Sequence, residues 1–439
     1  MTRRYVIVGN GPAGLTAAET IRRHDAAGEI TIIGDENVPF YSRPGLAYLL
    51  TGTIPEKQLF SRPDSDYVRQ RLQRKVGRVQ AIDPRGHQIS LADGRSLAYD
   101  RLLLAIGARA LRPEIPGIDL EGVVTLDNLE DARRILRLAR RAKRACVVGG
   151  GITAVELAEG LAAQRVETHY LMRKDRYWGG VLDPQESTLV ETRLADERIR
   201  VHRGVDLAAV VERRGRVVAI DTRSGARLPC DLLAVAIGTQ PRLDLARQAG
   251  LATGRGIWTD DTFRTSDADI YAAGDVAEVL DPGTGERVLD SLWSVAIEQG
   301  KAAGENLCGV DQPYRREAPF NVTRIGGVTT TLIGAVGSGA RDEDLVTLSR
   351  GDSQAWRQRL DAFAGVSDAG ANRLRVLLGA DRIVGAVVMG DQTLSRPLQH
   401  LIRGRIDIRP VRDHLIQRPS EVIQVLKGFA QRTVPLAAV

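Results

Sequence analysis

Cysteine is scarce in this chain of 439 residues, and the few thiols are not grouped. Cys146, Cys230 and Cys308 lie far apart and form neither a CxxC motif nor a cluster with histidine. Iron–sulfur clusters and structural zinc sites draw on closely spaced cysteines, so we expect neither. The six histidines are also scattered, and no metal site is predicted. Each thiol is expected to fill a small apolar or semi-buried space.

Aromatic residues, blocks of like charge and long apolar runs are also lacking. Aromatics make up 4% of the chain, which argues against single-stranded nucleic-acid binding because that role needs stacking rings. The net charge of +6 is spread along the chain, which is typical of a solvated surface and also suits anionic partners such as dinucleotides or an acidic electron carrier. No nucleic-acid partner is predicted. Without a membrane-length apolar run or a signal peptide, a soluble cytoplasmic protein is expected.

The first recognisable unit is a strand, a glycine turn, a helix and a second strand near the N-terminus. Apolar runs predict strands at 5–8 and 30–33, with an alanine-rich helix over 15–23 between them. The intervening GxGxxG lets the backbone approach a pyrophosphate at the positive end of a helix. An acidic residue after the second strand can accept hydrogen bonds from a ribose. The predicted dinucleotide contacts are Gly9, Gly11, Pro12, Ala13, Gly14 and Glu36.

A second copy of this unit begins about 140 residues later. Strands are predicted at 145–148 and 168–171, on either side of a helix over 152–163. Where an NAD site usually offers an acid after the second strand, this chain has Arg173 and Lys174, which suit a 2′-phosphate. We therefore predict a preference for NADPH, while NADH stays open because both cations can be plain surface charges. Two such units in one chain predict hydride transfer between two cofactors.

The rest of the chain is predicted to be rich in strands. The similar segments 100–107 and 231–238 each predict a strand that closes a nucleotide domain, and β-meanders are expected over 76–97 and 201–228. After about residue 314 the predicted elements are strands over 328–336, 374–378 and 383–388, and then helices over 398–403 and 421–429.

Residues 265–275 carry a longer and more specific motif, Thr-Ser-Asp-Ala-Asp-Ile-Tyr-Ala-Ala-Gly-Asp. It resembles the second FAD motif of the pyridine nucleotide–disulfide oxidoreductase superfamily, in which the last residue, here Asp275, binds the flavin ribityl chain. The following residues from Trp293 to Gly304 resemble that family's next helix, which points at the flavin. The resemblance extends from residue 1 to about 312. It implies FAD on the first unit and NADPH or NADH on the second.

Residues 39–46 narrow the resemblance to one group. They resemble the PYxRPxL segment of rubredoxin and ferredoxin reductases and of the FAD region of nitrite reductase large subunits, with Arg43 at the flavin. Disulfide reductases carry a redox cysteine here, and this chain has none, so electrons are expected to leave directly from the flavin. The implied acceptor is a small redox protein or a partner reductase subunit. Alternatives are an oxidase or quinone-type reductase of a small acceptor, and a nucleotide-sensing flavoprotein without enzymatic activity, as in the similar apoptosis-inducing factors.

One residue departs from the pattern of that group. Ferredoxin reductases of this type usually place a lysine two residues after the Leu46 position, paired with a glutamate near the flavin. Here the position is Tyr48, while Glu156 resembles the glutamate. We assign both to the catalytic site, where Tyr48 either shields or hydrogen-bonds the flavin or is a packing aromatic.

The predicted fold class is therefore α/β, with two Rossmann-like dinucleotide-binding domains of three-layer ββα type and a C-terminal α+β domain. The FAD-binding domain is expected at 1–112 and 238–315, the NAD(P)-binding domain at 113–237, and an acceptor or homodimer-forming domain at 316–439. The remaining predicted cofactor-binding residues are Ala105, Gly107, Gly274, Gly149, Gly151, Ile152 and Gly238.

Overall fold

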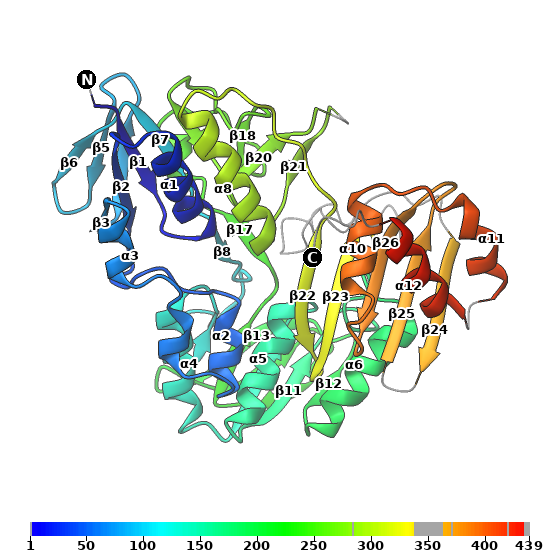
Figure 1. Cartoon of the computed structure of the whole chain (residues 1–439). Helices are drawn as coiled ribbons and strands as arrows, with labels where there is room; N and C mark the ends of the chain where they lie inside the picture. The colour runs from blue at the N-terminus through cyan, green and yellow to red at the C-terminus, as the bar shows by residue number, and fades with distance from the viewer. Residues whose placement is uncertain (1, 283–284, 338–362, 370–371, 419–420, 434–439) are drawn as a thin grey trace.

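The computed structural model describes residues 2–282, 285–337, 363–369, 372–418 and 421–433, with the backbone alone for 363–369. The structure has three parts, each built around a β-sheet (Figure 1). The N-terminal sheet lies in the upper part of the view, the second sheet below it, and the C-terminal sheet beside the second. No described helix is long and apolar enough to cross a membrane.

The first sheet is parallel and takes strands from distant parts of the chain. Its buried strands are rich in isoleucine, valine and leucine, which is typical of a parallel sheet covered on both faces. Helix α1 (Pro12–His24) follows the first strand, as predicted, and packs against α8 (Trp293–Leu307). The strand order is β19 (Ile270–Ala272), β7 (Arg101–Leu104), β1 (Arg4–Val8), β2 (Glu29–Gly34) and β3 (Leu72–Val76).

Two glycines of α8 allow α1 to approach closely. A Cβ at Gly300 would meet the Ala13 carbonyl oxygen at 2.3 Å, and one at Gly304 would meet the Ala17 carbonyl oxygen at 2.8 Å. These distances are too short for any side chain. The contact therefore requires glycine, and it holds the N-terminal end of α1 in place beside the first glycine turn.

Small antiparallel sheets flank the first sheet. The predicted meander over 76–97 begins only at Val79, because Val76 still pairs with Gly34 in the parallel sheet. The flanking sheets are β4 (Val79–Asp83), β5 (Gln88–Leu91) and β6 (Ser96–Ala98), then β18 (Ile257–Thr259), β20 (Ala277–Leu280) and β21 (Arg287–Leu289), and the pair β8 (Ala108–Ala110) and β17 (Thr239–Pro241). Short helical segments are α2 (Gly45–Leu50), Glu56–Leu59, α3 (Asp64–Arg69) and α7 (Asp244–Gln248).

The second sheet repeats the arrangement of the first. Helix α5 (Ile152–Ala163) has the predicted bounds and follows a glycine turn. The predicted meander over 201–228 was partly wrong, because Val201 pairs with Tyr170 in the parallel sheet. The strand order is β12 (Arg200–His202), β11 (Glu167–Leu171), β10 (Arg144–Val148), β16 (Leu232–Val235) and β9 (Val123–Val124), with helices α4 (Leu129–Ala139) and α6 (Pro184–Asp196) and the meander β13 (Leu207–Arg213), β14 (Arg216–Thr222) and β15 (Arg227–Pro229).

Helix α2 belongs by sequence to the first unit but packs on the second. Its leucines share a core with α4 and α5, and a Cβ at Gly160 of α5 would meet the Leu50 Cβ at 2.7 Å. Gln164 at the end of α5 donates to the Leu50 carbonyl oxygen at 2.8 Å. Figure 1 shows α2 in this position, between the two parallel sheets. The helix therefore places Tyr48 where the two units meet.

The C-terminal part is an antiparallel sheet backed by helices. The predicted strands and the two predicted helices are present, and a third helix, α11, was missed because it is short and begins with a proline in its first turn. The order is β22 (Phe320–Ile325), β23 (Val328–Gly334), β26 (Ile383–Met389), β25 (Asn372–Leu378) and β24 (Phe363–Ala369), with α10 (Ser395–Arg403), α11 (Arg409–Gln417) and α12 (Val422–Thr433).

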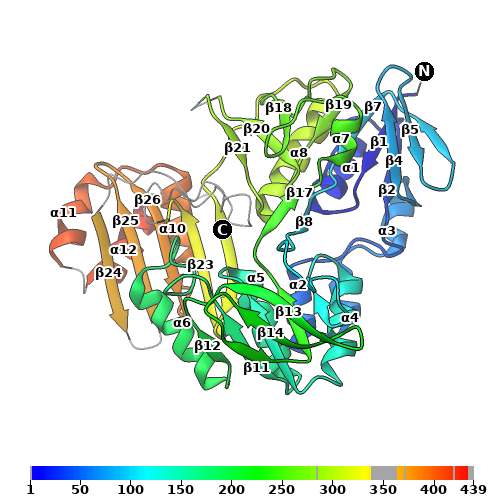
Figure 2. The same cartoon turned by 180° about the vertical axis from the view of Figure 1, so that it is seen from behind.

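Buried charges join this sheet to α6. Asp183 and Glu186 form the capping box at the start of α6. Arg375 of β25 donates to Glu186 at 2.9 Å, and Arg373 donates to Asp183 at 2.8 Å. The side chains of Glu186 and Arg373 are 0% and 4% exposed. Figure 2 shows α6 lying along the C-terminal sheet. The network thus places positive side chains against carboxylates that also satisfy a helix terminus.

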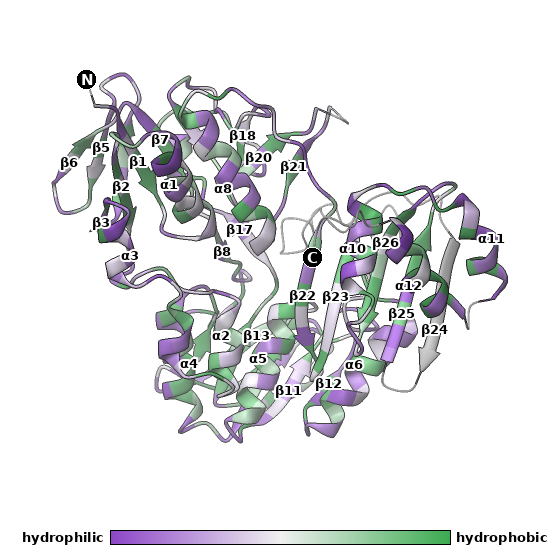
Figure 3. Ribbon diagram, in the orientation of Figure 1, coloured by the Kyte–Doolittle hydropathy of each residue, from purple (hydrophilic) through white to green (hydrophobic). Residues whose placement is uncertain are grey.

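Hydropathy explains how the helices pack on these sheets. In Figure 3, β1 carries the hydrophobic colour, while α4 shows alternating hydrophilic and hydrophobic bands. The apolar side of α4 is buried, including Leu129, Ala132 and Ile135. Such one-sided helices cover a sheet and leave charged residues in solvent.

Candidate functional site

A single cavity of about 1960 Å³ extends along the carboxyl ends of both parallel sheets. Ligands of open α/β sheets bind at this edge. The cavity contacts the turn after β1 and the turn after β10, so it joins the two predicted dinucleotide sites. The predicted site residues that line it are Gly9, Gly11, Pro12, Ala13, Glu36, Arg43, Tyr48, Ala105, Gly107, Gly149, Gly151, Ile152, Glu156, Arg173, Lys174, Gly238, Gly274, Asp275 and Trp293.

In both glycine turns, the first and the later glycine have different structural roles. A Cβ at Gly9 would meet the Ala105 carbonyl oxygen at 2.1 Å, and one at Gly149 would meet the Ala236 carbonyl oxygen at 2.2 Å. Both residues also have positive φ, at +114° and +156°. At Gly11 and Gly151, by contrast, a Cβ would meet nothing within 4 Å. The first glycine of each turn serves the fold, and the later one leaves open space beside a helix N-terminus.

These open spaces fit the pyrophosphate of a dinucleotide. Gly11 and Gly151 are the N-cap residues of α1 and α5, and neither cap makes a side-chain hydrogen bond to its helix. The first backbone N–H groups of both helices thus have no side-chain cap, and a phosphate is a natural partner for them. Gly14 is the one predicted contact that does not line the cavity. Its Cβ would meet the Gly9 carbonyl oxygen at 2.0 Å, so it serves close packing of α1 on the strand.

Glu36 is held in place by two neighbours at the first site. One carboxylate oxygen accepts from Arg43 at 2.8 Å, and the other accepts from the Tyr41 hydroxyl at 2.7 Å. Arg43 also donates to the backbone carbonyl of Asp127, which lies between β9 and α4 of the second unit. Each carboxylate oxygen keeps further acceptor capacity, so Glu36 can still accept from a ribose hydroxyl.

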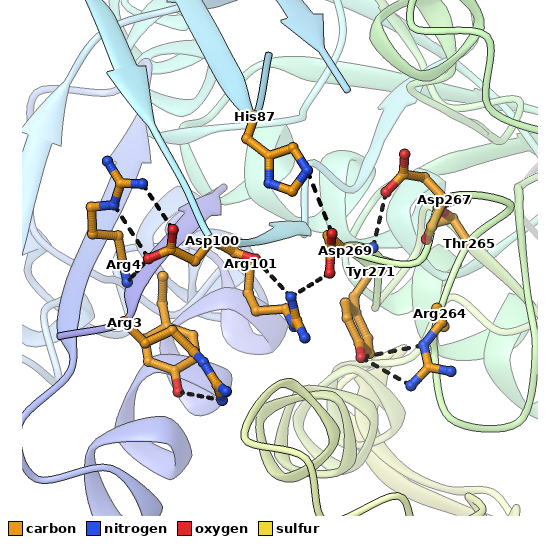
Figure 4. Close-up of polar contacts among 11 residues, drawn as sticks. Arg3, Arg4, His87, Asp100, Arg101, Arg264, Thr265, Asp267, Asp269 and Tyr271 are labelled. Carbon is orange, nitrogen blue, oxygen red and sulfur yellow. Dashed lines mark hydrogen bonds and ion pairs between the residues drawn. The ribbon is translucent and has the colours of Figure 1, made fainter. Parts of the chain in front are cut away.

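The motif at 265–275 reaches the cavity only at its end. Its first half holds the strand in place: Asp269 pairs with Arg101 of β7 and lies 3.5 Å from His87 (Figure 4). Asp267 accepts the Asp269 backbone N–H at 2.9 Å, also drawn in Figure 4. Strand β19 then runs parallel to β7 and delivers Asp275 to the cavity wall.

Asp275 follows a turn that only glycine adopts easily. Gly274 has φ +80°, and its N–H donates to the buried Gln299 side chain of α8 at 2.8 Å. Burial raises the pKa of Asp275 to about 6, although the charge of Arg43 opposes this shift. Trp293 at the start of α8 contacts Phe40, with ring centroids 5.7 Å apart. A polar chain such as ribityl would supply hydrogen bonds to this half-buried carboxyl.

Tyr48 and Glu156 face the cavity from α2 and α5, two helices that are in contact. Tyr48 is 36% exposed, and its hydroxyl has no hydrogen-bond partner in the described part of the chain. Its role at the flavin stays a prediction. Glu156 is half-buried. Burial, and then the charge of Glu159, raise the pKa of Glu156 to about 7. At neutral pH the carboxyl group is therefore protonated in a large fraction of molecules.

The structure also brings residues to the cavity that the sequence did not single out. Arg173 and Lys174 line it as predicted, and Trp178 joins them with φ +45°, a rare conformation for a bulky residue. Asp127 and Arg242 also line the cavity. Burial raises the pKa of Asp127. No local motif marks these three residues, because they reach the cavity through the packing of loops.

The cysteines lie away from this chemistry. Cys146 and Cys230 are buried in an apolar cluster of the second unit, and Cys308 is half-buried. None lines the cavity. This agrees with the predicted role of cysteine as a filler of small spaces.

The model of the pyridine nucleotide-disulphide oxidoreductase family matches residues 3–300. The chain belongs to this family. It is 34% identical over 397 residues to the ferredoxin–NAD(+) reductase component of the biphenyl dioxygenase system of Paraburkholderia xenovorans, covering 88% of this chain and 94% of that protein. It is 31% identical over 340 residues to an NADH oxidase of Methanocaldococcus jannaschii, 74% of each chain. A ferredoxin reductase structure from Rhodopseudomonas palustris superposes with a TM-score of 0.85 at 25% identity, over 98% of this chain and 100% of that one.

Family membership confirms the predicted superfamily and the two-Rossmann fold class. The protein is an oxidoreductase, and the family implies FAD and NAD(P)H as its cofactors. The open cradles at Gly11 and Gly151 are consistent with these groups.

Proposed function

We propose that this protein is an NAD(P)H-dependent flavoprotein reductase that passes electrons from a bound flavin to a small redox protein of the ferredoxin or rubredoxin kind. The observation that carries the proposal is the single cavity that joins both glycine cradles. A nicotinamide and a flavin held on separate domains can react only when one continuous space lets their rings meet. The same function is supported by relatives that are named ferredoxin reductases and match this chain over most of its length.

The residues of the chain divide the work between binding and positioning. Gly11 and the N-terminus of α1 are proposed to hold the FAD pyrophosphate, with Glu36 at the ribose and Asp275 at the ribityl chain. Gly151 and the N-terminus of α5 are proposed to hold the nicotinamide nucleotide. When bound, FAD supplies the link between a two-electron donor and one-electron acceptors. Because the cofactors carry the chemistry, no nucleophile is required of the protein.

The proposed nucleotide is NADPH in preference to NADH. The names of the similar proteins point to NAD(+) or NADH. In this chain, however, β11 is followed by Met172, Arg173 and Lys174, and all three line the cavity. Cations at this position favour a 2′-phosphate, whereas an NAD site usually has an acid there. The Arg173→Ala/Lys174→Ala double variant should lower kcat/KM for NADPH by about tenfold or more and leave NADH nearly unchanged.

Anaerobic stopped-flow spectroscopy tests the main proposal. The purified protein, with its flavin, is mixed with NADPH and then in a separate series with NADH, and bleaching of the flavin absorbance is followed. Bleaching at a rate that supports turnover is expected, followed by fast reoxidation when a ferredoxin or rubredoxin is added. Bleaching far too slow for turnover, or a protein without flavin, would refute the proposal.

A second candidate is direct reduction of oxygen, which the similarity to an NADH oxidase favours. The two functions separate in one assay. NAD(P)H consumption in air, without a protein acceptor, should be slow for an electron-transfer reductase and fast for an oxidase. An oxidase rate equal to the rate with a redox protein would favour the second candidate.

A further inference from the structure

Helix α5 carries two carboxyl groups one turn apart, Glu156 and Glu159. Residues spaced by three positions lie on the same side of a helix. Glu156 lines the cofactor cavity. Glu159 does not, and instead accepts the backbone N–H of Gly327 at 2.9 Å, where the turn between β22 and β23 rests on the second unit. The pair therefore connects the cavity to the edge of the C-terminal sheet.

Glu156 lies on the cavity side of α5 and Glu159 lies nearer the surface, and the two carboxyl groups have different neighbours. Glu156 makes no hydrogen bond or ion pair within the described residues, and its charged neighbour is Glu159. Glu159 is also influenced by Glu197 at the end of α6 and by Arg324 of β22, both exposed. The other elements packed on α5 bring Tyr48 of α2, the buried Tyr170 of β11, and the apolar strands β10 and β16. Polarity and exposure therefore increase from Glu156 toward Arg324.

Both carboxyl groups can hold or lose a proton near neutral pH. Burial is the main reason that the pKa of each is raised to about 7. For Glu156, the charge of Glu159 raises it further, and for Glu159 the Gly327 N–H opposes the rise. Groups with a pKa close to the ambient pH are suited to passing protons in either direction.

The proposed reaction leaves a proton that such groups can accept. NAD(P)H gives up two electrons and one proton when it is oxidised to NAD(P)+. If the two electrons leave singly to a redox protein, that proton remains in the cavity. Glu156 lines the cavity and is half-buried, so its carboxylate is placed to take up this proton.

We propose that Glu156 and Glu159 form a two-carboxyl relay that carries this proton from the cofactor cavity to the surface beside Gly327. Glu156 receives the proton on a carboxylate oxygen and passes it to Glu159, which releases it to solvent near Glu197 and Arg324. The relay rests on the proposed function, because it handles the proton that this function leaves behind.

The test measures proton release separately from electron transfer. The complete protein, reduced anaerobically with one equivalent of NADH, is mixed with excess ferricyanide, a one-electron acceptor, in weakly buffered solution containing a pH indicator. One proton is released for each NADH oxidised and each pair of ferricyanide ions reduced. We compare wild type with Glu159→Gln and Glu156→Gln. Glutamine at 159 keeps an oxygen that can accept from Gly327.

Glu212→Gln is the matched control. Glu212 also accepts a glycine N–H in a hairpin turn, from Gly215 at 3.1 Å, but it is exposed and lies away from the cavity. In the relay variants, the rate of proton release should be on the order of 100-fold lower than the rate of ferricyanide reduction. The double variant should be no slower than the slower single variant, since the two groups act in series. The control should match wild type.

An infrared measurement gives a readout that does not depend on turnover. The band of a protonated carboxylic acid should titrate near pH 7 in the wild-type flavoprotein and lose intensity in each relay variant. Proton release that keeps pace with ferricyanide reduction in Glu159→Gln, as in the control, would overturn the relay. Absence of flavin reduction in the wild type would instead overturn the proposed function, so the two failures are distinguishable.

Discussion

The glycine turn after β10 offers a paired prediction, because two neighbouring glycines should respond in opposite ways to the same added methyl group. At Gly149, a Cβ would lie 2.2 Å from the Ala236 carbonyl oxygen, on a backbone with positive φ. At Gly151, φ is −114° and a Cβ would meet nothing within 4 Å. Gly149→Ala should therefore damage the fold, and Gly151→Ala should damage only the binding of a ligand that needs the open space.

The expected magnitudes follow from these contacts. The backbone overlap in Gly149→Ala should cost about 1–3 kcal/mol of unfolding free energy, which lowers Tm by several degrees. Gly151→Ala should leave stability unchanged or raise it by about 0.4–1 kcal/mol, because alanine restricts the unfolded chain. In the nucleotide complex, the same methyl should weaken NAD(P)H binding by about 1–3 kcal/mol, or roughly 5- to 150-fold in Kd.

The assay combines thermal unfolding with anaerobic nucleotide titration of each purified variant. The flavin absorbance per chain serves as the internal control, since the cradle at Gly11 is unchanged in both variants and FAD content should remain full. Unchanged nucleotide affinity in Gly151→Ala would show that the phosphates do not use this space. An unchanged Tm in Gly149→Ala would show that the turn relaxes without cost. Either result would refute the reasoning.

Three further predictions concern other parts of the molecule. Arg375→Met should lower the free energy of unfolding in urea by about 3–5 kcal/mol, because it leaves the buried Glu186 without its hydrogen-bonded arginine. Arg409→Met, which breaks an exposed pair with Asp407, should leave the urea midpoint unchanged. Equal shifts of the urea midpoint in the two variants would contradict the role of the buried network. Glu159→Gln should be more stable than wild type above about pH 7 and not below pH 4.5, because a raised carboxyl pKa favours the folded state only while the group is protonated; a pH-independent difference in urea midpoints would argue against this. Asp275→Ala should retain less FAD through gel filtration, and full occupancy would count against its contact with the ribityl chain.

Both dinucleotide units were predictable from sequence because their signals are local. The turn at Gly9–Gly14 is flanked by an apolar strand and an alanine-rich helix, and each of these patterns predicts its element without distant contacts. The bounds of α5 agree with the prediction for the same reason. The meanders were less accurate at their starts. At Val76 and Val201 the residue pattern suits any strand, and only the pairing partner decides between a parallel sheet and a meander.

Contacts between segments that are distant in the chain could not be predicted from the sequence. Nothing local indicates that Arg373 and Arg375, in an apolar strand, would meet the capping box of α6 some 190 residues earlier. Trp178 reaches the cavity by a loop conformation that its residue type does not favour. The placement of α2 on α5 was equally hidden, since α2 follows the first unit in sequence and shares a core with the second.

That placement gives the departure at Tyr48 its physical meaning. A lysine on α2 would lie beside the same cavity as Glu156 and would favour the charged carboxylate. With tyrosine there, Glu156 faces no cation in the described structure, and burial together with Glu159 keeps its pKa near 7. A fixed ion pair holds its proton state constant, whereas a group that titrates near neutrality can exchange a proton in each cycle. In the proposed relay, tyrosine at position 48 therefore leaves Glu156 free of a pairing lysine on α2 and able to exchange a proton, and Glu159, one turn along α5, receives that proton.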